Sequence, residues 1–142
     1  DIVIASVHSA MNQDEQTMTD RIIAAMHNPY VDIVAHPTGR VLGRRDPYAV
    51  DIERVIAAAR DTGTCLEINA SPERLDLKDV HARAAKDAGA WLVVNTDAHR
   101  AEGLEQMSFG ITVARRGWVE KQHVLNCLPL DELLRTLKRS RA

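Results

Sequence analysis

The fold of this chain is decided by the stretch Trp91-Leu92-Val93-Val94-Asn95-Thr96-Asp97-Ala98-His99. Its apolar run from Trp91 to Val94 is typical of a buried β-strand, and Asp97 and His99 follow where that run ends. In an extended segment, side chains two residues apart point to the same face, so this pair could share one metal ion or substrate. A transition-metal site takes three or four protein ligands, so the rest of the chain must supply partners.

The same pattern, a short apolar strand that ends in a polar residue, occurs three more times upstream. The predicted strands are 2–7, 31–35 and 64–70, which end at or near His8, His36 and Asn69. The interval is about 30 residues, the size of one βα unit. Helices are predicted between the strands at 17–27, 51–61 and 76–88, the last with Asp76 as its N-cap. This alternation indicates a parallel sheet with right-handed crossovers.

Side-chain alternation favours a barrel over a flat sheet. One predicted strand face is apolar, as helices packed outside a barrel require, whereas a doubly wound sheet would be apolar on both faces. In barrels, polar groups gather at the carboxyl ends of the strands. The predicted inward face carries polar groups at that end, and its members are Ser6 and His8; Asp32, Val34 and His36; Cys65, Glu67 and Asn69; Val93, Asn95 and Asp97. A complete barrel takes about 250 residues, so about four βα units make roughly half of one. Short helices are predicted after them, at 119–125 and 130–137.

Composition excludes several classes of protein. The chain has 142 residues, 45% of them hydrophobic, and a formal charge of −2, which predicts one domain and requires any basic surface to be local. No apolar run approaches the roughly 20 residues of a membrane span, and no signal-peptide pattern is present, so we expect a soluble cytoplasmic protein. The chain begins at Asp1, without Met and directly on a strand pattern, which suggests a piece of a longer protein.

Four residues on the predicted inward face suit phosphoester hydrolysis: His8, His36, Asp97 and His99. Neutral imidazoles and a carboxylate bind Mn²⁺ or Zn²⁺. Such a metal offsets phosphate charge and lowers the pKa of a bound water. The alternative is that each strand-end histidine is a hydrogen-bonded structural residue, but their shared face favours metal binding. The helical His27, His81 and His123 are interpreted as structural.

Arginines cluster in the loop that follows the second strand. Arg40, Arg44 and Arg45 lie on the face of the predicted site, and a guanidinium binds phosphate bidentately. The alternative is a surface loop whose arginines pair with nearby aspartates. Arg74 and Arg115 are further candidates for binding phosphate or DNA.

Five blocks, taken in order, resemble one known family: Ala5-Ser6-Val7-His8-Ser9, Ala35-His36-Pro37-Thr38-Gly39-Arg40, Leu66-Glu67-Ile68-Asn69-Ala70, Thr96-Asp97-Ala98-His99 and Ala114-Arg115-Arg116-Gly117-Trp118. The family is the polymerase and histidinol phosphatase (PHP) domain, and the similarity is closest to the PHP module of bacterial family X DNA polymerases. The resemblance implies the C-terminal portion of a distorted (βα)₇ barrel with a multinuclear Mn²⁺ or Zn²⁺ centre, so that residues 1–142 form one partial PHP domain without its N-terminal strands.

By this resemblance, His8, His36, Asp97 and His99 fall on metal-ligand positions. Glu67, Asn69 and Asn95 are expected beside the metals without binding them. The implied activity is 3′-5′ exonuclease and phosphatase action on DNA 3′ ends in DNA repair, with the polymerase core and the N-terminal half of the barrel as missing partners.

Two alternatives stay open: a histidinol-phosphatase-like enzyme acting on a small phosphoester, and an inactive half-barrel that serves as a structural or interaction module. In the half-barrel, unpaired sheet edges invite a homodimer.

Overall fold

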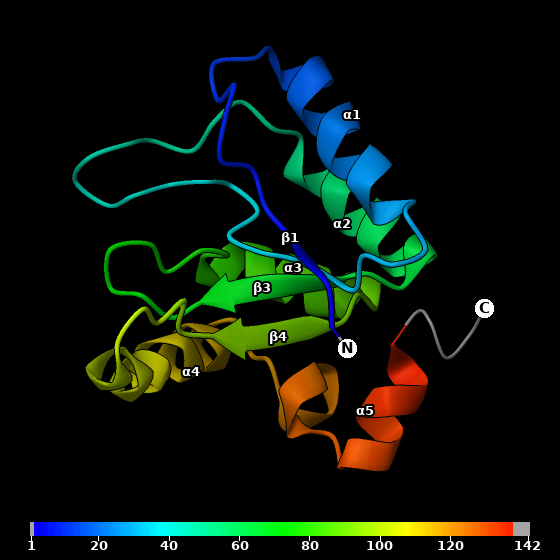
Figure 1. The fold of residues 1–142 in the computed structure, drawn as a ribbon, viewed down its shortest axis with the longest axis vertical. Coiled ribbons are helices and arrows are strands. Elements are labelled where there is room, and N and C mark those ends of the chain that lie inside the picture. Colours follow the sequence, from blue (N-terminus) through cyan, green and yellow to red (C-terminus); the bar gives the residue numbers. More distant parts are fainter. Residues whose placement is uncertain (1, 138–142) are drawn as a thin grey trace.

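Strands and helices alternate along the chain (Figure 1), and the computed structural model describes residues 2–137. The elements in order are β1 (Ile4–Ala5), α1 (Glu15–Met26), β2 (Ile33–Val34), α2 (Ile52–Thr62), β3 (Cys65–Asn69), α3 (Asp79–Ala88), β4 (Leu92–Asn95), the 3₁₀ helix η1 (Ala101–Gln106), α4 (Met107–Arg116), the 3₁₀ helices η2 (Lys121–His123) and η3 (Leu125–Cys127), and α5 (Leu130–Thr136). The predicted α/β fold, four βα units of a partial barrel followed by C-terminal helices, is confirmed.

The sheet is parallel and its strands lie in sequence order, β1-β2-β3-β4. Its register pairs Ile4 with Ile33, Val34 with Leu66, and Asn69 with Asn95. The carboxyl ends of neighbouring strands therefore meet at one edge. β1 and β2 are two residues long each, shorter than the predicted strands, because the chain turns into loops directly after Ala5 and Val34.

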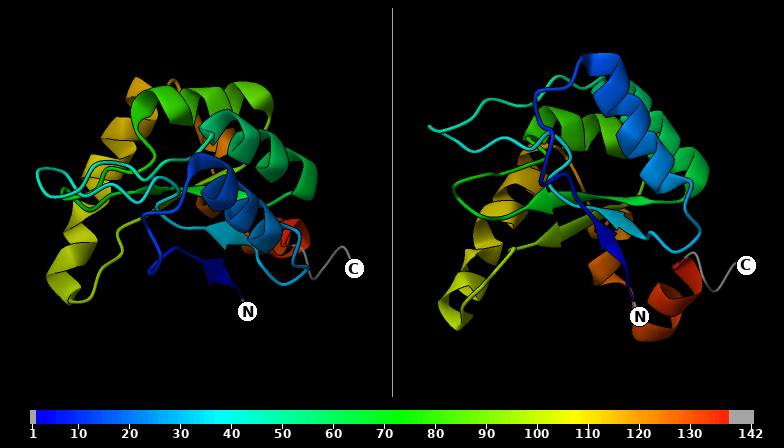
Figure 2. Two further views of the ribbon diagram at one scale, coloured as in Figure 1. Left: turned by 90° about the horizontal axis from the view of Figure 1, so that it is seen from above. Right: turned by 45° about the horizontal axis from the view of Figure 1, so that its top comes forward.

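Four helices, α1 to α4, pack on one face of the sheet (Figure 2), where they form the main core with Val34, Leu66, Ile68 and Leu92. The predicted alternation holds for β3 and β4 but is wrong for β2. Val34 packs on the helix side, while Ile33 packs on the other face with Cys65 and Val93. The pairing register forces this result, because residues paired across neighbouring strands point to the same face.

The segment after α4 crosses to the open face of the sheet. Leu125 and Leu137 join Ile33, Cys65 and Val93 in a second, smaller core. The same segment covers the β4 edge, where Val94 N donates to Asn126 Oδ1 at 3.2 Å and Asn126 Nδ2 donates to Val94 O at 2.7 Å. The predicted helix at 119–125 is therefore wrong. The segment forms two 3₁₀ helices, and the Asn126 side chain pairs with the backbone of Val94 as a neighbouring strand would.

Local side-chain chemistry explains where the helices begin. Asp14 accepts from Thr17 N at 2.9 Å at the start of α1, and Asp51 accepts from Arg54 N at 3.1 Å at the start of α2. The prediction that Asp76 caps α3 is wrong, because the N-cap residue is Lys78, which makes no side-chain cap bond. Asp76 is buried instead and accepts from Thr38 N at 3.0 Å.

Within residues 2–137, no helix is both long enough and apolar enough to cross a membrane.

Candidate metal and phosphate site

A pocket of about 460 Å³ opens at the carboxyl ends of the strands. It receives His8 from the loop after β1, His36 from the loop after β2, Glu67 from β3 and Asp97 from the loop after β4. The remaining lining residues are Ile4, Ser6, Ala35, Val94, Asn95, Thr96, Leu104, Met107 and Asn126. Three of the four predicted metal ligands thus line one pocket.

His36 is the most constrained of these residues. It is 4% exposed and has a φ of 33°, a left-handed backbone conformation that bends the chain out of β2. Burial, and then the nearby Arg74 guanidinium, lower the pKa of His36 to about 4. Its ring is therefore neutral near pH 7, as metal binding requires. Nδ1 is buried and has no hydrogen-bond partner within residues 2–137, a cost that binding to a metal would remove.

Glu67 holds this part of the site together. The Glu67 carboxylate is buried and accepts three hydrogen bonds: from His36 N at 2.7 Å, Asn69 Nδ2 at 3.1 Å and Asn95 Nδ2 at 3.1 Å. Burial raises the pKa of Glu67, and these hydrogen bonds oppose the rise. Because three donors already occupy the carboxylate, Glu67 is suited to positioning His36 rather than to binding a metal.

Asp97 has two neighbours that fix its carboxylate. Asn69 Nδ2 donates to Asp97 Oδ2 at 3.3 Å, and Arg74 Nε lies 3.6 Å from the same oxygen. The rings of His8 and His36, which also line the pocket, pack edge to face with their centroids 5.5 Å apart. His8 Nε2 is also 2.6 Å from Ser6 Oγ.

His99 is not among the residues that line this pocket. β4 ends at Asn95 and Asp97 has a φ of 55°, so the assumption of an extended segment through His99 is wrong. The exposed ring folds back, with Nδ1 2.8 Å from the backbone carbonyl oxygen of Asp97. Metal binding by His99 stays a prediction.

The donor types suit Mn²⁺ or Zn²⁺, but their number is incomplete. No group of three His, Cys, Asp or Glu side chains in residues 2–137 is close enough together to hold a metal ion.

The predicted phosphate-binding arginines separate into three groups. Arg74 reaches Asp97 at the pocket. Arg40, Arg44 and Arg45 line a different pocket, beside α3. Arg115 lies in the last turn of α4 and lines a third, mostly apolar pocket with Ile111 and Val119. Sequence reasoning missed Lys78 and His81, which line the same pocket as Arg40, because only the tertiary fold brings α3 against the arginine loop.

Comparison with known proteins gives the chain relatives over nearly its whole length. It is 50% identical over 140 residues to the DNA polymerase/3′-5′ exonuclease PolX of Bacillus subtilis, covering 99% of this chain and 25% of that protein. It is 33% identical to a probable phosphatase of Thermoanaerobacter sp., covering 89% of this chain and 53% of that protein. A probable phosphatase of Shewanella sp. is also 33% identical, over 92% of this chain and 52% of its own length.

No protein-family model matches the chain. The chain spans about a quarter of PolX and about half of each probable phosphatase. It is thus a relative of a segment of bacterial PolX and of these phosphatases, and the resemblance to the PHP module of bacterial family X DNA polymerases is confirmed.

Proposed function

We propose that this chain is part of a metal-dependent phosphoesterase domain that hydrolyses phosphodiester and phosphomonoester bonds at DNA 3′ ends. The observation that carries the proposal is the meeting of His8, His36 and Asp97 in one pocket at the carboxyl ends of parallel strands. The 50% identity to PolX, which is named as a polymerase and 3′-5′ exonuclease, supports the choice of DNA as substrate.

In this proposal, residues 1–142 form one partial PHP domain, and further ligands come from parts of the protein outside it. His8, His36 and Asp97 hold Mn²⁺ or Zn²⁺, and His99 joins them by turning toward the pocket. When bound, the metal supplies charge to offset phosphate and lowers the pKa of a water. Glu67 and Asn69 keep His36 and Asp97 in place through the hydrogen bonds at 2.7 and 3.3 Å. Arg74 supplies a fixed positive charge beside Asp97.

The test is Mn²⁺-dependent release of nucleotides from the 3′ end of a 5′-labelled single strand by the full-length protein. His36→Ala and Asp97→Ala should each lower the rate by about 100-fold or more, since removing even an outer partner of a metal ligand costs 10- to 100-fold. His27→Ala is the matched control, because His27 is exposed at the end of α1. Undiminished nuclease activity in both site variants would refute the proposal.

A second candidate function is hydrolysis of a small phosphomonoester, as in a histidinol phosphatase. The identities of 33% to proteins named probable phosphatases favour it. The same wild-type protein should then turn over a small phosphomonoester such as histidinol phosphate faster than a DNA 3′ end.

A third candidate, an inactive half-barrel that serves as an interaction module, is supported by the incomplete ligand set in residues 2–137. It requires that the full-length protein show neither activity.

A further inference from the structure

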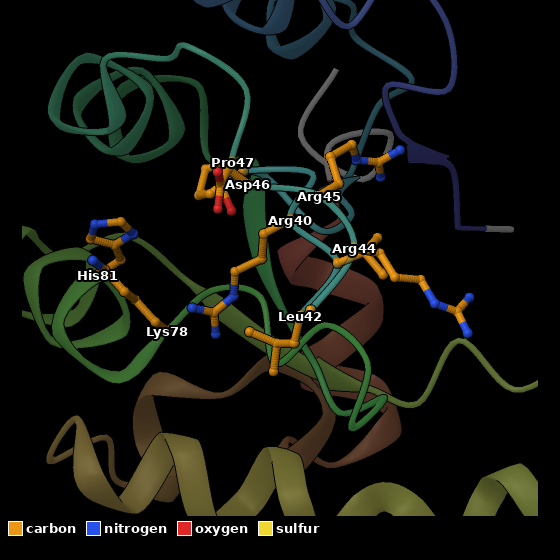
Figure 3. A pocket seen from close by; sticks show the side chains of 11 residues that line it. Arg40, Leu42, Arg44, Arg45, Asp46, Pro47, Lys78 and His81 are labelled. Carbon is orange, nitrogen blue, oxygen red and sulfur yellow. The ribbon is translucent and has the colours of Figure 1, made fainter.

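A second polar pocket, of about 490 Å³, lies between the 38–47 loop and the first turn of α3 (Figure 3). Lys78 and His81 form one wall, and Arg40 extends from the loop toward them, while Arg44 and Arg45 point the other way. This pocket shares no lining residue with the candidate metal site.

Arg40 is held in place in a way that leaves much of its guanidinium available. Its Nε donates to Arg74 O at 2.8 Å, and Nη2 donates to Leu75 O. A guanidinium has five N–H groups, so these two bonds fix its plane and leave the other N–H groups without an acceptor among residues 2–137. A planar donor fixed in this way binds phosphate at a reduced entropic cost.

Lys78 adds a second positive charge. No carboxylate of the described residues lies within 4.0 Å of its ammonium group, whereas Arg44 and Arg116 have acidic neighbours, Glu73 at 3.9 Å and Asp79 at 2.9 Å. His81 lines the pocket with Lys78 and Arg40; burial first, and then the charges of these two cations, lower the pKa of His81. Among residues 2–137, Asp46 is the one carboxylate that lines it.

The cationic pocket continues into a neighbouring one of about 330 Å³, since Arg40 and Lys78 line both. The neighbouring pocket is bounded by α4, where Phe109 is 48% exposed. A positive groove with an exposed aromatic ring is the combination that binds single-stranded nucleic acid, because the charges hold phosphates and the ring stacks on a base. We name this groove, from Arg40 and Lys78 to Phe109, the α3–α4 groove.

Arg74 connects the groove with the candidate metal site. Arg74 Nη1 donates to Arg40 O at 3.5 Å, and Arg74 Nε lies 3.6 Å from Asp97 Oδ2. One residue therefore contacts both the loop that carries Arg40 and the carboxylate of the pocket. A strand whose 3′ end lies at the pocket would need only a short path to reach the groove.

We propose that the α3–α4 groove binds the single strand upstream of the 3′ end, with a phosphate at Arg40 and Lys78 and a base on Phe109. This inference rests on the proposed action on DNA, and it adds Lys78 and Phe109, which neither the motifs nor the relatives assign. Because the groove and the metal pocket have separate residues, binding and hydrolysis can be tested separately.

The test measures binding of a fluorescent oligothymidylate to the full-length protein in EDTA, by anisotropy over a range of NaCl concentrations. Lys78→Gln should make the plot of log affinity against log salt shallower by about 0.7, the value for one phosphate contact on a single strand. Phe109→Ala should weaken binding about tenfold at every salt concentration without changing the slope, because stacking is not an ionic contact. Lys78→Arg should keep the wild-type slope.

Arg83→Gln, in the same helix α3, is the control for charge, and Ile111→Ala, exposed on α4, is the control for apolar surface. Thermal melting of each variant checks folding. The groove proposal would be overturned if Lys78→Gln and Phe109→Ala both kept the wild-type slope and affinity. It would also be overturned if the two control variants lost as much affinity for the oligonucleotide as the groove variants. Hydrolysis by the wild type with Mn²⁺ is scored separately. If the wild type has nuclease activity but the groove variants bind the oligonucleotide as the wild type does, the groove proposal alone is refuted. If the groove variants bind more weakly but the wild type has no nuclease activity, the proposed function alone is refuted.

Discussion

At the scale of single residues, the site depends most on Glu67. Its carboxylate receives three N–H donors from three different segments, and two of the donor residues, His36 and Asn95, line the pocket. Glu67→Ala would remove the acceptor of His36 N and Asn95 Nδ2, while Asn69 Nδ2 keeps Asp97 Oδ2. Each buried group left unsatisfied costs about 1–3 kcal/mol. We expect Glu67→Ala to lower the free energy of unfolding by about 2–4 kcal/mol in urea denaturation.

Glu67→Gln separates shape from charge at the same position. The glutamine oxygen can accept from His36 N and Asn69 as Glu67 Oε2 does, and only the Asn95 contact must reorganise. The loss should therefore be about 1 kcal/mol, the value of one hydrogen bond. Glu53→Ala, an exposed carboxylate on α2, should change stability by less than about 0.5 kcal/mol. Equal losses for Glu67→Ala and Glu53→Ala would show that Glu67 does not organise the site.

At the scale of elements, α4 sits against the sheet at Gly110. A Cβ placed there would lie 2.6 Å from Val94 Cγ1 and 2.7 Å from Ala70 Cβ. Gly110→Ala gains about 1 kcal/mol in helix propensity, but forcing an atom into a packed interface costs about 1–3 kcal/mol. These contacts are shorter than any normal carbon–carbon approach, so the clash should dominate.

We expect a net loss of about 1–2 kcal/mol for Gly110→Ala in the free energy of unfolding. Ser108→Ala, exposed in the same helix, gains propensity without the clash and should be neutral or slightly stabilising. A Gly110→Ala variant at least as stable as the wild type would mean that α4 does not pack this closely.

Sequence reasoning predicted the elements better than it predicted the directions of their side chains. Periodicity placed α1 to α3 and the four strands, because burial repeats with the helix and strand period. It failed beside the two residues with positive φ, His36 and Asp97. Counting back from His36 gave the wrong faces for Ile33 and Val34, and the chain beyond Asp97 does not bring His99 into the pocket. It also failed for Asp76, since a buried aspartate and a helix cap have the same sequence signal.

The sequence likewise predicted one part of the candidate site and missed another. The motif positions of His8, His36 and Asp97 lie together because parallel strands align their ends. The α3–α4 groove had no such signal, since Lys78 and Phe109 lie about 30 residues apart and come together only because βα units pack side by side.

At the scale of the whole molecule, the two edges of the sheet differ. The β4 edge is covered by Asn126, which corrects the expectation that both edges are unpaired. The β1 edge has no neighbouring strand within residues 2–137, and its apolar side chains are exposed: Ile2 by 45%, Val3 by 37% and Ile4 by 52%. An open apolar edge of this kind pairs with another strand when one is within reach. The 142-residue chain on its own should therefore associate through β1.

Lysine in an edge strand opposes such pairing, because its charge would be buried between the two strands. Ile4→Lys should thus shift the isolated chain from dimer toward monomer in sedimentation equilibrium, over the range of concentrations in which the wild type associates. Val80→Lys makes the same change at an exposed position on α3, distant in the fold from the sheet edge, and should leave the wild-type equilibrium in place. If the chain stays monomeric at every concentration, the β1 edge does not recruit a second copy.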